Sequence, residues 1–186
     1  MIPKKTFGAC EIFLGAHYGA ARIESNVPLI ELQEVILNAL YNINRLTSRA
    51  VKKYLPSMSK LNLEIIFEVG VANGTSFYYI DDETLESFME KINREPPRIL
   101  DLICIIRYYK LRNGVRRTLR FDYYFMKFLF SSKMFELQVF HEKGLQRIDV
   151  EDLIKVLFEN INSEFAKRGI SPIKVRYSRS FNAQTF

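Results

Sequence analysis

The sequence predicts an α+β protein with a largely antiparallel sheet and three main helices. The first observation is Asn113-Gly114, which lies between two long β-type segments and is typical of a two-residue hairpin turn. The second is the helical spacing of apolar residues in two separate segments. The third is a weak repeat of strand, glycine-containing bend, strand and helix. Its three copies, each ending in Ile-Asn, are residues 11–44, 64–93 and 136–162.

The first half begins with small, β-compatible residues and continues into a long helix. Residues 7–24 contain glycines that permit a bend or a tight hairpin. Residues 26–55 then carry apolar side chains at helical spacing, with Asn26 as a candidate cap and Pro28 suited to the first turn. We expect this helix to end before Pro56.

Two strands and a second helix complete the first half. Residues 61–70 and 75–80 alternate as strands do, on either side of a turn at Ala72-Asn73-Gly74. Asp81 and Asp82 then favour the start of a short helix, where carboxylates complement the helix dipole. Two consecutive prolines stop this helix.

The second half is predicted to have the order ββββαβ. Asp149 and Gly169 are the signals that begin and close its helix. The expected elements are strands at 99–112, 115–130, 134–142 and 145–148, a helix at 149–168 and a strand at 173–181. The chain of 186 residues suits a single domain, 1–186, or two packed lobes, 1–95 and 98–186, divided at Pro96-Pro97.

Composition favours an intracellular globular protein without a cofactor. The sequence is 48% hydrophobic and 26% charged, and Cys10 and Cys104 are too far apart in sequence to indicate a disulfide framework or a metal cluster. We therefore expect a cytoplasmic location and no metal. No stretch approaches the ~20 apolar residues of a membrane span. The glycines Gly15 and Gly19 match neither a P-loop nor a dinucleotide fingerprint, so no cofactor is expected.

Positive charge is concentrated in the second half of the sequence. Residues 1–93 hold nine Lys or Arg and eleven Asp or Glu, whereas residues 94–186 hold eighteen and ten. The two halves thus differ in net charge by ten units, within a total of +6. Such asymmetry is typical of proteins with a polyanionic partner.

The Asn-Gly turn also predicts which side chains share a face of the hairpin. If Arg112 faces Val115 and the pairing continues without interruption, Arg107 lies directly opposite Arg120. The two arginines would then repel each other unless an anion lies across them. Tyr124 would share their face, and Asp122 would relieve only part of the charge.

Arginines flanked by tyrosines on a sheet face predict binding of single-stranded DNA or RNA without catalysis. Arginines neutralise phosphates, and aromatic rings stack on bases. The expected phosphate-binding residues are Arg107, Arg116, Arg120, Lys174 and Arg176. The expected base-stacking residues are Tyr109 and Tyr124.

Two alternative functions are also compatible with the sequence. Tyr and Arg are also common on strands that pack against other proteins, so this face could instead mediate self-association as a homodimer. Alternatively, His17 and His141 could form the acid–base pair of an RNA endonuclease, with Lys143 or Lys174 stabilising the phosphorane.

The order of four strands followed by a helix, predicted for residues 99–168, resembles the repeating unit of the Pur-alpha and Whirly single-strand-binding proteins. The resemblance is one of element order and implies a single-stranded nucleic acid as partner. It does not distinguish DNA from RNA.

Overall fold

The computed structural model describes residues 5–9, 19–59, 61–112 and 115–180 and contains nine strands and five helices in these ranges. The strands are β1 Thr6–Ala9, β2 Gly19–Glu24, β3 Leu63–Asn73, β4 Ser76–Tyr79, β5 Ile99–Arg112, β6 Val115–Thr118, β7 Asp122–Phe130, β8 Met134–Lys143 and β9 Val175–Ser180. The helices are α1 Leu29–Ile43, α2 Ser48–Tyr54, α3 Pro56–Ser59, α4 Asp82–Arg94 and α5 Val150–Lys167.

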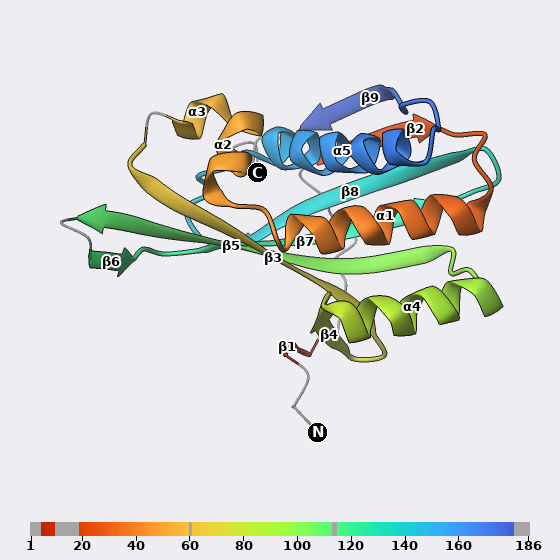
Figure 1. Ribbon diagram of the computed structural model, residues 1–186, viewed down its shortest axis with the longest axis horizontal. Coiled ribbons are helices and arrows are strands. Elements are labelled where there is room, and N and C mark those ends of the chain that lie inside the picture. The colour runs from red at the N-terminus through yellow and green to blue at the C-terminus, as the bar shows by residue number, and fades with distance from the viewer. Residues whose placement is uncertain (1–4, 10–18, 60, 113–114, 181–186) are drawn as a thin grey trace, which may run out of the picture.

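All nine strands belong to one sheet, in the order β1-β4-β3-β5-β7-β8-β2-β9, with β6 paired to the end of β5 (Figure 1). Each neighbouring pair is antiparallel. The predicted α+β fold with an antiparallel sheet is therefore confirmed. The two halves of the sequence are interleaved, because β3 pairs with β5 and β2 lies between β8 and β9.

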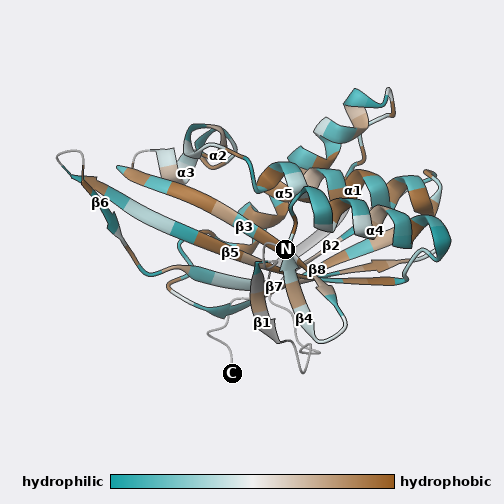
Figure 2. Ribbon diagram, turned by 60° about the horizontal axis from the view of Figure 1, so that its bottom comes forward, coloured by the Kyte–Doolittle hydropathy of each residue, from teal (hydrophilic) through white to brown (hydrophobic). Residues whose placement is uncertain are grey.

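The helices cover one face of the sheet, and the opposite face carries no helix in the described residues (Figure 2). Helices α1 and α5 pack side by side over the centre of the sheet, and α4 packs beside α1. The main core lies between the helices and the sheet and contains fully buried side chains such as Leu40, Phe67, Phe128 and Phe165. We call the helix-free side the open face.

The prediction of one long helix over residues 26–55 is wrong, because the structure has two separate helices, α1 and α2, in this segment. Helix α1 ends at Ile43, because the Asn44 side chain turns to the sheet, where its Nδ2 donates to the carbonyl of Val69 (3.0 Å) and its Oδ1 accepts from the amide of Val69 (2.6 Å). A new helix, α2, begins after Thr47, whose hydroxyl accepts from the amide of Ala50 (3.3 Å). At the other end, Pro28 occupies the N-cap position that was expected for Asn26.

The predicted boundaries of the other two helices hold. Asp81 is the N-cap of α4 and accepts from the amide of Thr84 at 2.8 Å. Asp149 precedes α5, although its side chain makes no capping hydrogen bond. Gly169 follows α5 with φ of +70°, the left-handed conformation expected of a closing glycine.

The predicted hairpin register holds beside the turn but not along the whole return strand, and the turn residues Asn113 and Gly114 themselves lie outside the described residues. Strand β6 pairs with β5 as expected, with Arg112 opposite Val115. The return strand is then interrupted at residues 119–121, and β7 resumes its pairing with β5 one residue out of step, with Cys104 opposite Tyr124. Because side chains alternate between faces, this shift sends Asp122 and Tyr124 to the helix side and Tyr123 to the open face.

The carboxylate of Asp122 explains why the register shifts. Its side chain is completely buried and accepts hydrogen bonds from the Tyr108 hydroxyl (2.8 Å) and from the amides of Gln146 (2.8 Å) and Arg147 (3.0 Å). The Nε2 atom of His141 lies 3.6 Å from its Oδ1. Burial raises the pKa of Asp122, but these neighbours together lower it below its usual range.

The two backbone amides that donate to Asp122 belong to a loop that the sequence predicts as a strand. Residues 145–148 form no strand but wrap around Asp122. Gly144 has φ of +120°, and a Cβ atom there would approach Asp122 Oδ1 to 2.1 Å. Gln146 also has positive φ, at 47°. Arg147 completes the loop by donating to the carbonyl of Arg120 (2.9 Å), within the interruption of the strand.

This arrangement predicts that Asp122→Asn lowers the free energy of unfolding by a large amount that depends on pH. The neutral amide cannot accept all the hydrogen bonds that the carboxylate accepts, so the free energy of unfolding should fall by about 2–3 kcal/mol at pH 7. A carboxyl with a lowered folded-state pKa stabilises the fold above its unfolded pKa of about 3.9 and loses that contribution as the pH falls further. Urea denaturation at pH 7 and pH 3 should therefore show a smaller difference between parent and variant at pH 3.

The matched control is Asp101→Asn, which removes a carboxylate from the open face of β5. Burial raises the pKa of Asp101, and Lys127 at 3.8 Å lowers it. The ionised form of Asp101 therefore stabilises the fold little, and this control should lower the free energy of unfolding by less than about 1 kcal/mol at pH 7. Equal losses in the two variants would contradict a special role for Asp122.

Candidate nucleic-acid interface

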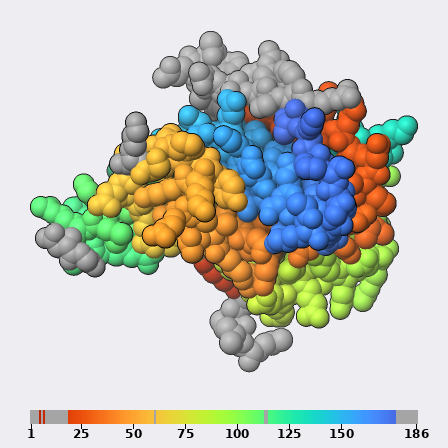
Figure 3. All heavy atoms as spheres, turned by 45° about the horizontal axis from the view of Figure 1, so that its top comes forward, coloured from red at the N-terminus to blue at the C-terminus, as the bar shows by residue number. Residues whose placement is uncertain are grey.

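The end of β5 and the short strand β6 form a hairpin that projects beyond the helices (Figure 3, green, left). Strand alternation gives this projecting hairpin two exposed sides. Tyr109, Leu111, Arg116 and Thr118 lie on the side of the open face, in opposed pairs. Lys110, Arg112, Val115 and Arg117 lie on the other side, where the register pairs Lys110 with Arg117 and Arg112 with Val115.

Two of the predicted phosphate-binding arginines are ion-paired to glutamates of the neighbouring strand β3. Arg107 Nε donates to Glu68 Oε2 at 2.6 Å, and Lys5 contacts the other oxygen of Glu68 at 2.5 Å. Arg116 binds Glu64 through two hydrogen bonds of 2.6 and 2.5 Å. Burial raises the pKa of Glu68, but Lys5 and Arg107 lower it below the usual range.

The predicted repulsion between Arg107 and Arg120 is wrong. The interruption at residues 119–121 removes Arg120 from the position opposite Arg107. Instead, Arg107 has Ile66 of β3 as its cross-strand neighbour and Glu68 as its ion-pair partner. Sequence pattern on the hairpin alone could not reveal this, because the compensating charge comes from another strand.

The two predicted stacking tyrosines have different environments. Tyr109 is half-buried on the open face, and the guanidinium of Arg116 lies 4.1 Å from its ring centroid. Tyr124 is completely buried under the helices and donates a hydrogen bond to the carbonyl of Ile148. Its predicted place on the basic face is wrong, because the register shift turns it inward.

The remaining predicted residues are dispersed. Arg120 is exposed beside the strand interruption. Lys174 is exposed just before β9, and Arg176 lies within β9, although its side chain is outside the described part of the structure. Strand β9 is the fourth strand from β5 in the sheet, a separation of roughly 20 Å at the usual strand spacing. Lys174 and Arg176 therefore do not adjoin the hairpin arginines.

Sequence reasoning missed a second group of cations on the hairpin. Lys110, Arg112 and Arg117 are exposed, share one side and carry no ion pair with any described residue. Period-two alternation assigns them to the core side of the strand, which normally excludes charge. They are solvated here because the hairpin extends past the end of the helix layer (Figure 2).

The endonuclease alternative depends on two histidines, of which His17 lies outside the described residues. His141 is largely buried, and its Nε2 atom has no hydrogen-bond partner in the described part of the chain. Its ring lies 4.9 Å from that of Tyr124, inside the Asp122 cluster. His141 is thus directed into the core, and the pairing of the two histidines stays a prediction.

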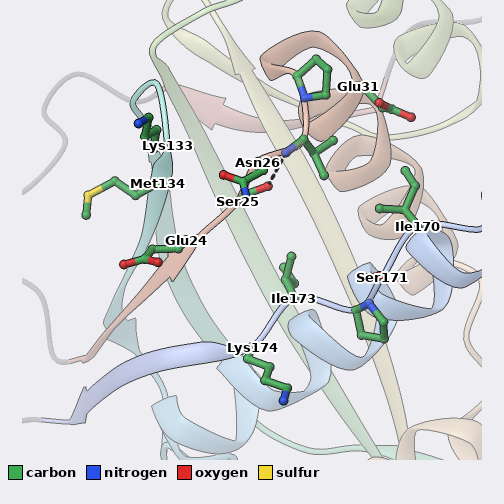
Figure 4. Close-up of a pocket in the computed structure, with 13 residues that line it drawn as sticks. Glu24, Ser25, Asn26, Glu31, Lys133, Met134, Ile170, Ser171, Ile173 and Lys174 are labelled. Atoms are coloured by element: carbon green, nitrogen blue, oxygen red, sulfur yellow. Dashed lines mark hydrogen bonds between the residues drawn. The ribbon is translucent and has the colours of Figure 1, made fainter.

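A large pocket lies at the opposite end of the sheet from the hairpin. It has a volume of about 880 Å³ and is formed by the end of β2, the β7–β8 turn and the segment between α5 and β9. Lysines and glutamates both line it, so it offers no uniform charge to a ligand. Figure 4 shows Lys133 and Lys174 well separated across this pocket, so these two lysines do not converge on one phosphate.

No described helix is long and apolar enough to cross a membrane. Within the same residues, no cluster of three His, Cys, Asp or Glu side chains is suited to a metal ion. Cys104 is a buried free thiol whose pKa is raised by burial, and Cys10 lies outside the described residues.

The sequence is similar to part of one curated protein. It is 25% identical over 189 residues to the E-type subunit of the glutamyl-tRNA(Gln) amidotransferase of Saccharolobus solfataricus. The alignment covers 98% of this chain but 24% of the relative, so this chain spans about a quarter of the length of that relative. No protein-family profile matches the sequence, and no solved structure matches it.

The ion pairs of the open face predict that Arg107 contributes to stability. Replacing Arg107 by alanine leaves Glu68 with Lys5 as its remaining partner, which should lower the free energy of unfolding by about 1 kcal/mol. Urea denaturation measures this change. An uncompensated Arg107–Arg120 contact would give the opposite result, a variant more stable than the parent.

Proposed function

We propose that this protein binds single-stranded or unpaired stretches of nucleic acid, RNA in the first place, without catalysing a reaction on them. The proposed contact surface is the projecting hairpin. The observation that carries the proposal is the group of exposed cations Lys110, Arg112 and Arg117, which form no ion pair within the described residues, with exposed Arg120 at the base of the hairpin.

Folding does not account for these cations. Lys110 and Arg117 are directly opposed in the β5–β6 ladder, and like charges in that position destabilise a strand pair. The glutamates of β3 neutralise Arg107 and Arg116 on the other side of the hairpin and leave this side positive. A polyanion would relieve the repulsion and release condensed counterions on binding.

The comparison with known proteins favours RNA over DNA. The similar protein is named as part of an enzyme that acts on glutamyl-tRNA(Gln). Because this chain corresponds to about a quarter of that relative, the proposal extends to RNA contact and not to amidotransfer. A cytoplasmic location is part of the proposal, since two cysteines so far apart in the sequence give no sign of a disulfide framework.

The proposal predicts that the hairpin cations carry the salt dependence of binding. In the triple variant Lys110→Gln, Arg112→Gln and Arg117→Gln, affinity for a labelled 12-nucleotide RNA should fall about tenfold or more at 0.1 M salt. The slope of log affinity against log salt should become shallower by about 2, since each phosphate contact on a single strand contributes about 0.7. Fluorescence anisotropy over a range of salt concentrations measures both quantities.

A charge-matched control separates this surface from the overall net charge. The variant Arg98→Gln, Lys133→Gln and Lys155→Gln removes three exposed cations from elsewhere on the molecule. Its affinity and slope should stay close to those of the parent. The proposal is wrong if both triple variants weaken binding equally, or if the parent binds neither RNA nor DNA at low salt.

Self-association or docking on another protein is a second candidate, favoured by the apolar residues near the hairpin tip. Val115 is 68% exposed and Leu111 43% exposed, on opposite sides of the hairpin. If the tip mediates dimerisation, Val115→Lys should convert a dimer to a monomer in sedimentation equilibrium. A parent that is already monomeric at 100 μM would exclude self-association through the tip at physiological concentrations.

A further inference from the structure

A small pocket lies on the open face beside residues 119–121, the interruption that separates β6 from β7. Its lining residues are Arg120, Phe121, Tyr123, Lys143 and Gly144, and its volume is about 380 Å³. This is within the range of pockets that hold small organic ligands. The pocket adjoins the base of the projecting hairpin, through Arg120.

Two aromatic rings and a glycine shape the pocket. The rings of Phe121 and Tyr123 meet edge to face, with centroids 5.1 Å apart, and both side chains are half-buried. Gly144 packs its Cα against the strand interruption, where an added Cβ would lie 2.5 Å from the carbonyl oxygen of Phe121. The glycine therefore allows the β8 end to approach the strand interruption closely, which brings Lys143 and Gly144 beside Phe121 and Tyr123 at one pocket.

The charged residues of the pocket are both cations. Arg120 and Lys143 are exposed and carry no ion pair with any described residue. They come from different segments, because Arg120 lies in the interruption between β6 and β7, whereas Lys143 lies at the end of β8, in register with Tyr123. Arg107 lies nearby with its guanidinium 5.4 Å from the Phe121 ring centroid, but its charge is paired with Glu68.

We infer that this pocket binds one nucleotide, with the base against Phe121 and Tyr123 and a phosphate between Arg120 and Lys143. An aromatic ring beside unpaired cations suits a planar base joined to a phosphate and suits few other common ligands. The inference rests on the proposed function, because it places one nucleotide of the bound strand here while the hairpin holds the neighbouring phosphates. Aromatic surface is also what sequence-tolerant single-strand binding requires.

The aromatic rings also have a structural use, which the test must separate from binding. Phe121 and Tyr123 pack against the small apolar cluster of Phe77, Ile103 and Ile105 on the open face. Leucine at position 123 retains an apolar contact with that cluster but offers no ring for stacking. The variant Tyr123→Leu should therefore keep the fold, which thermal unfolding checks.

The first experiment uses a 12-nucleotide RNA with a single 2-aminopurine, whose fluorescence is quenched when the base stacks. The parent should quench one position strongly on binding, and Tyr123→Leu should abolish that quenching and weaken affinity about tenfold. Its salt slope should be unchanged, because stacking releases few counterions. The control Tyr78→Leu, which alters a half-buried tyrosine near α4, should behave like the parent.

The double variant Arg120→Gln and Lys143→Gln tests the phosphate contact. It should weaken RNA binding and reduce the salt slope by about 1. If Tyr123→Leu and this double variant both bind RNA like the parent while the hairpin triple variant does not, the pocket inference is overturned and the proposed function stands.

A second arm distinguishes a nucleotide in a strand from a free nucleotide. Adenosine monophosphate is titrated into labelled protein while the NMR amide signal of Gly144 is followed, with inorganic phosphate and adenosine as controls. Movement of this signal with adenosine monophosphate, and less with either control, supports the pocket. If it moves but no RNA or DNA binds, the pocket inference holds for a free nucleotide and the proposed function fails. If neither ligand binds, both are overturned.

Discussion

The buried carboxylate of Asp122 is the constraint on which the C-terminal half of the sheet depends. A charge without solvent contact is tolerated only where donors surround it, and here the donors come from β5 and from the loop after β8, with the His141 ring of β8 close by. To place Asp122 among them, the return strand of the hairpin must slip by one residue. The ladder hydrogen bonds lost at the slip are offset by hydrogen bonds to a charged acceptor, which are individually stronger.

The same slip determines what the protein presents on its open face. It turns Tyr124 into the core and brings Phe121 and Tyr123 outward, beside Arg120. It also divides one long hairpin into a part that is integrated in the sheet and a part that projects from it. A structural requirement inside the protein thus generates both surfaces on which the functional proposals rest.

Features fixed by local chemistry could be predicted from the sequence, whereas features fixed by distant partners could not. A few adjacent residues determine the pairing of Arg112 with Val115, the Asp81 cap and the left-handed glycine after α5. In contrast, residues 121–130 carry large side chains at both odd and even positions, so alternation cannot select the register. The donors that select it lie up to 25 residues away. The break after Ile43 likewise depends on Asn44 reaching Val69 in β3.

The hairpin carries two kinds of basic residue, which the structure distinguishes and the sequence does not. Arg107 and Arg116 are bound to glutamates of β3, so their charge attaches the hairpin to the sheet. Lys110 and Arg117 face each other and have no acidic partner in the part of the chain that the structure describes, so their mutual repulsion opposes folding. A repulsion of this kind lowers the stability of the fold by a modest amount, and the binding of an anion relieves it. The position of these opposed cations, and not the total charge of the protein, is therefore the basis on which we propose the hairpin as the surface for a polyanion.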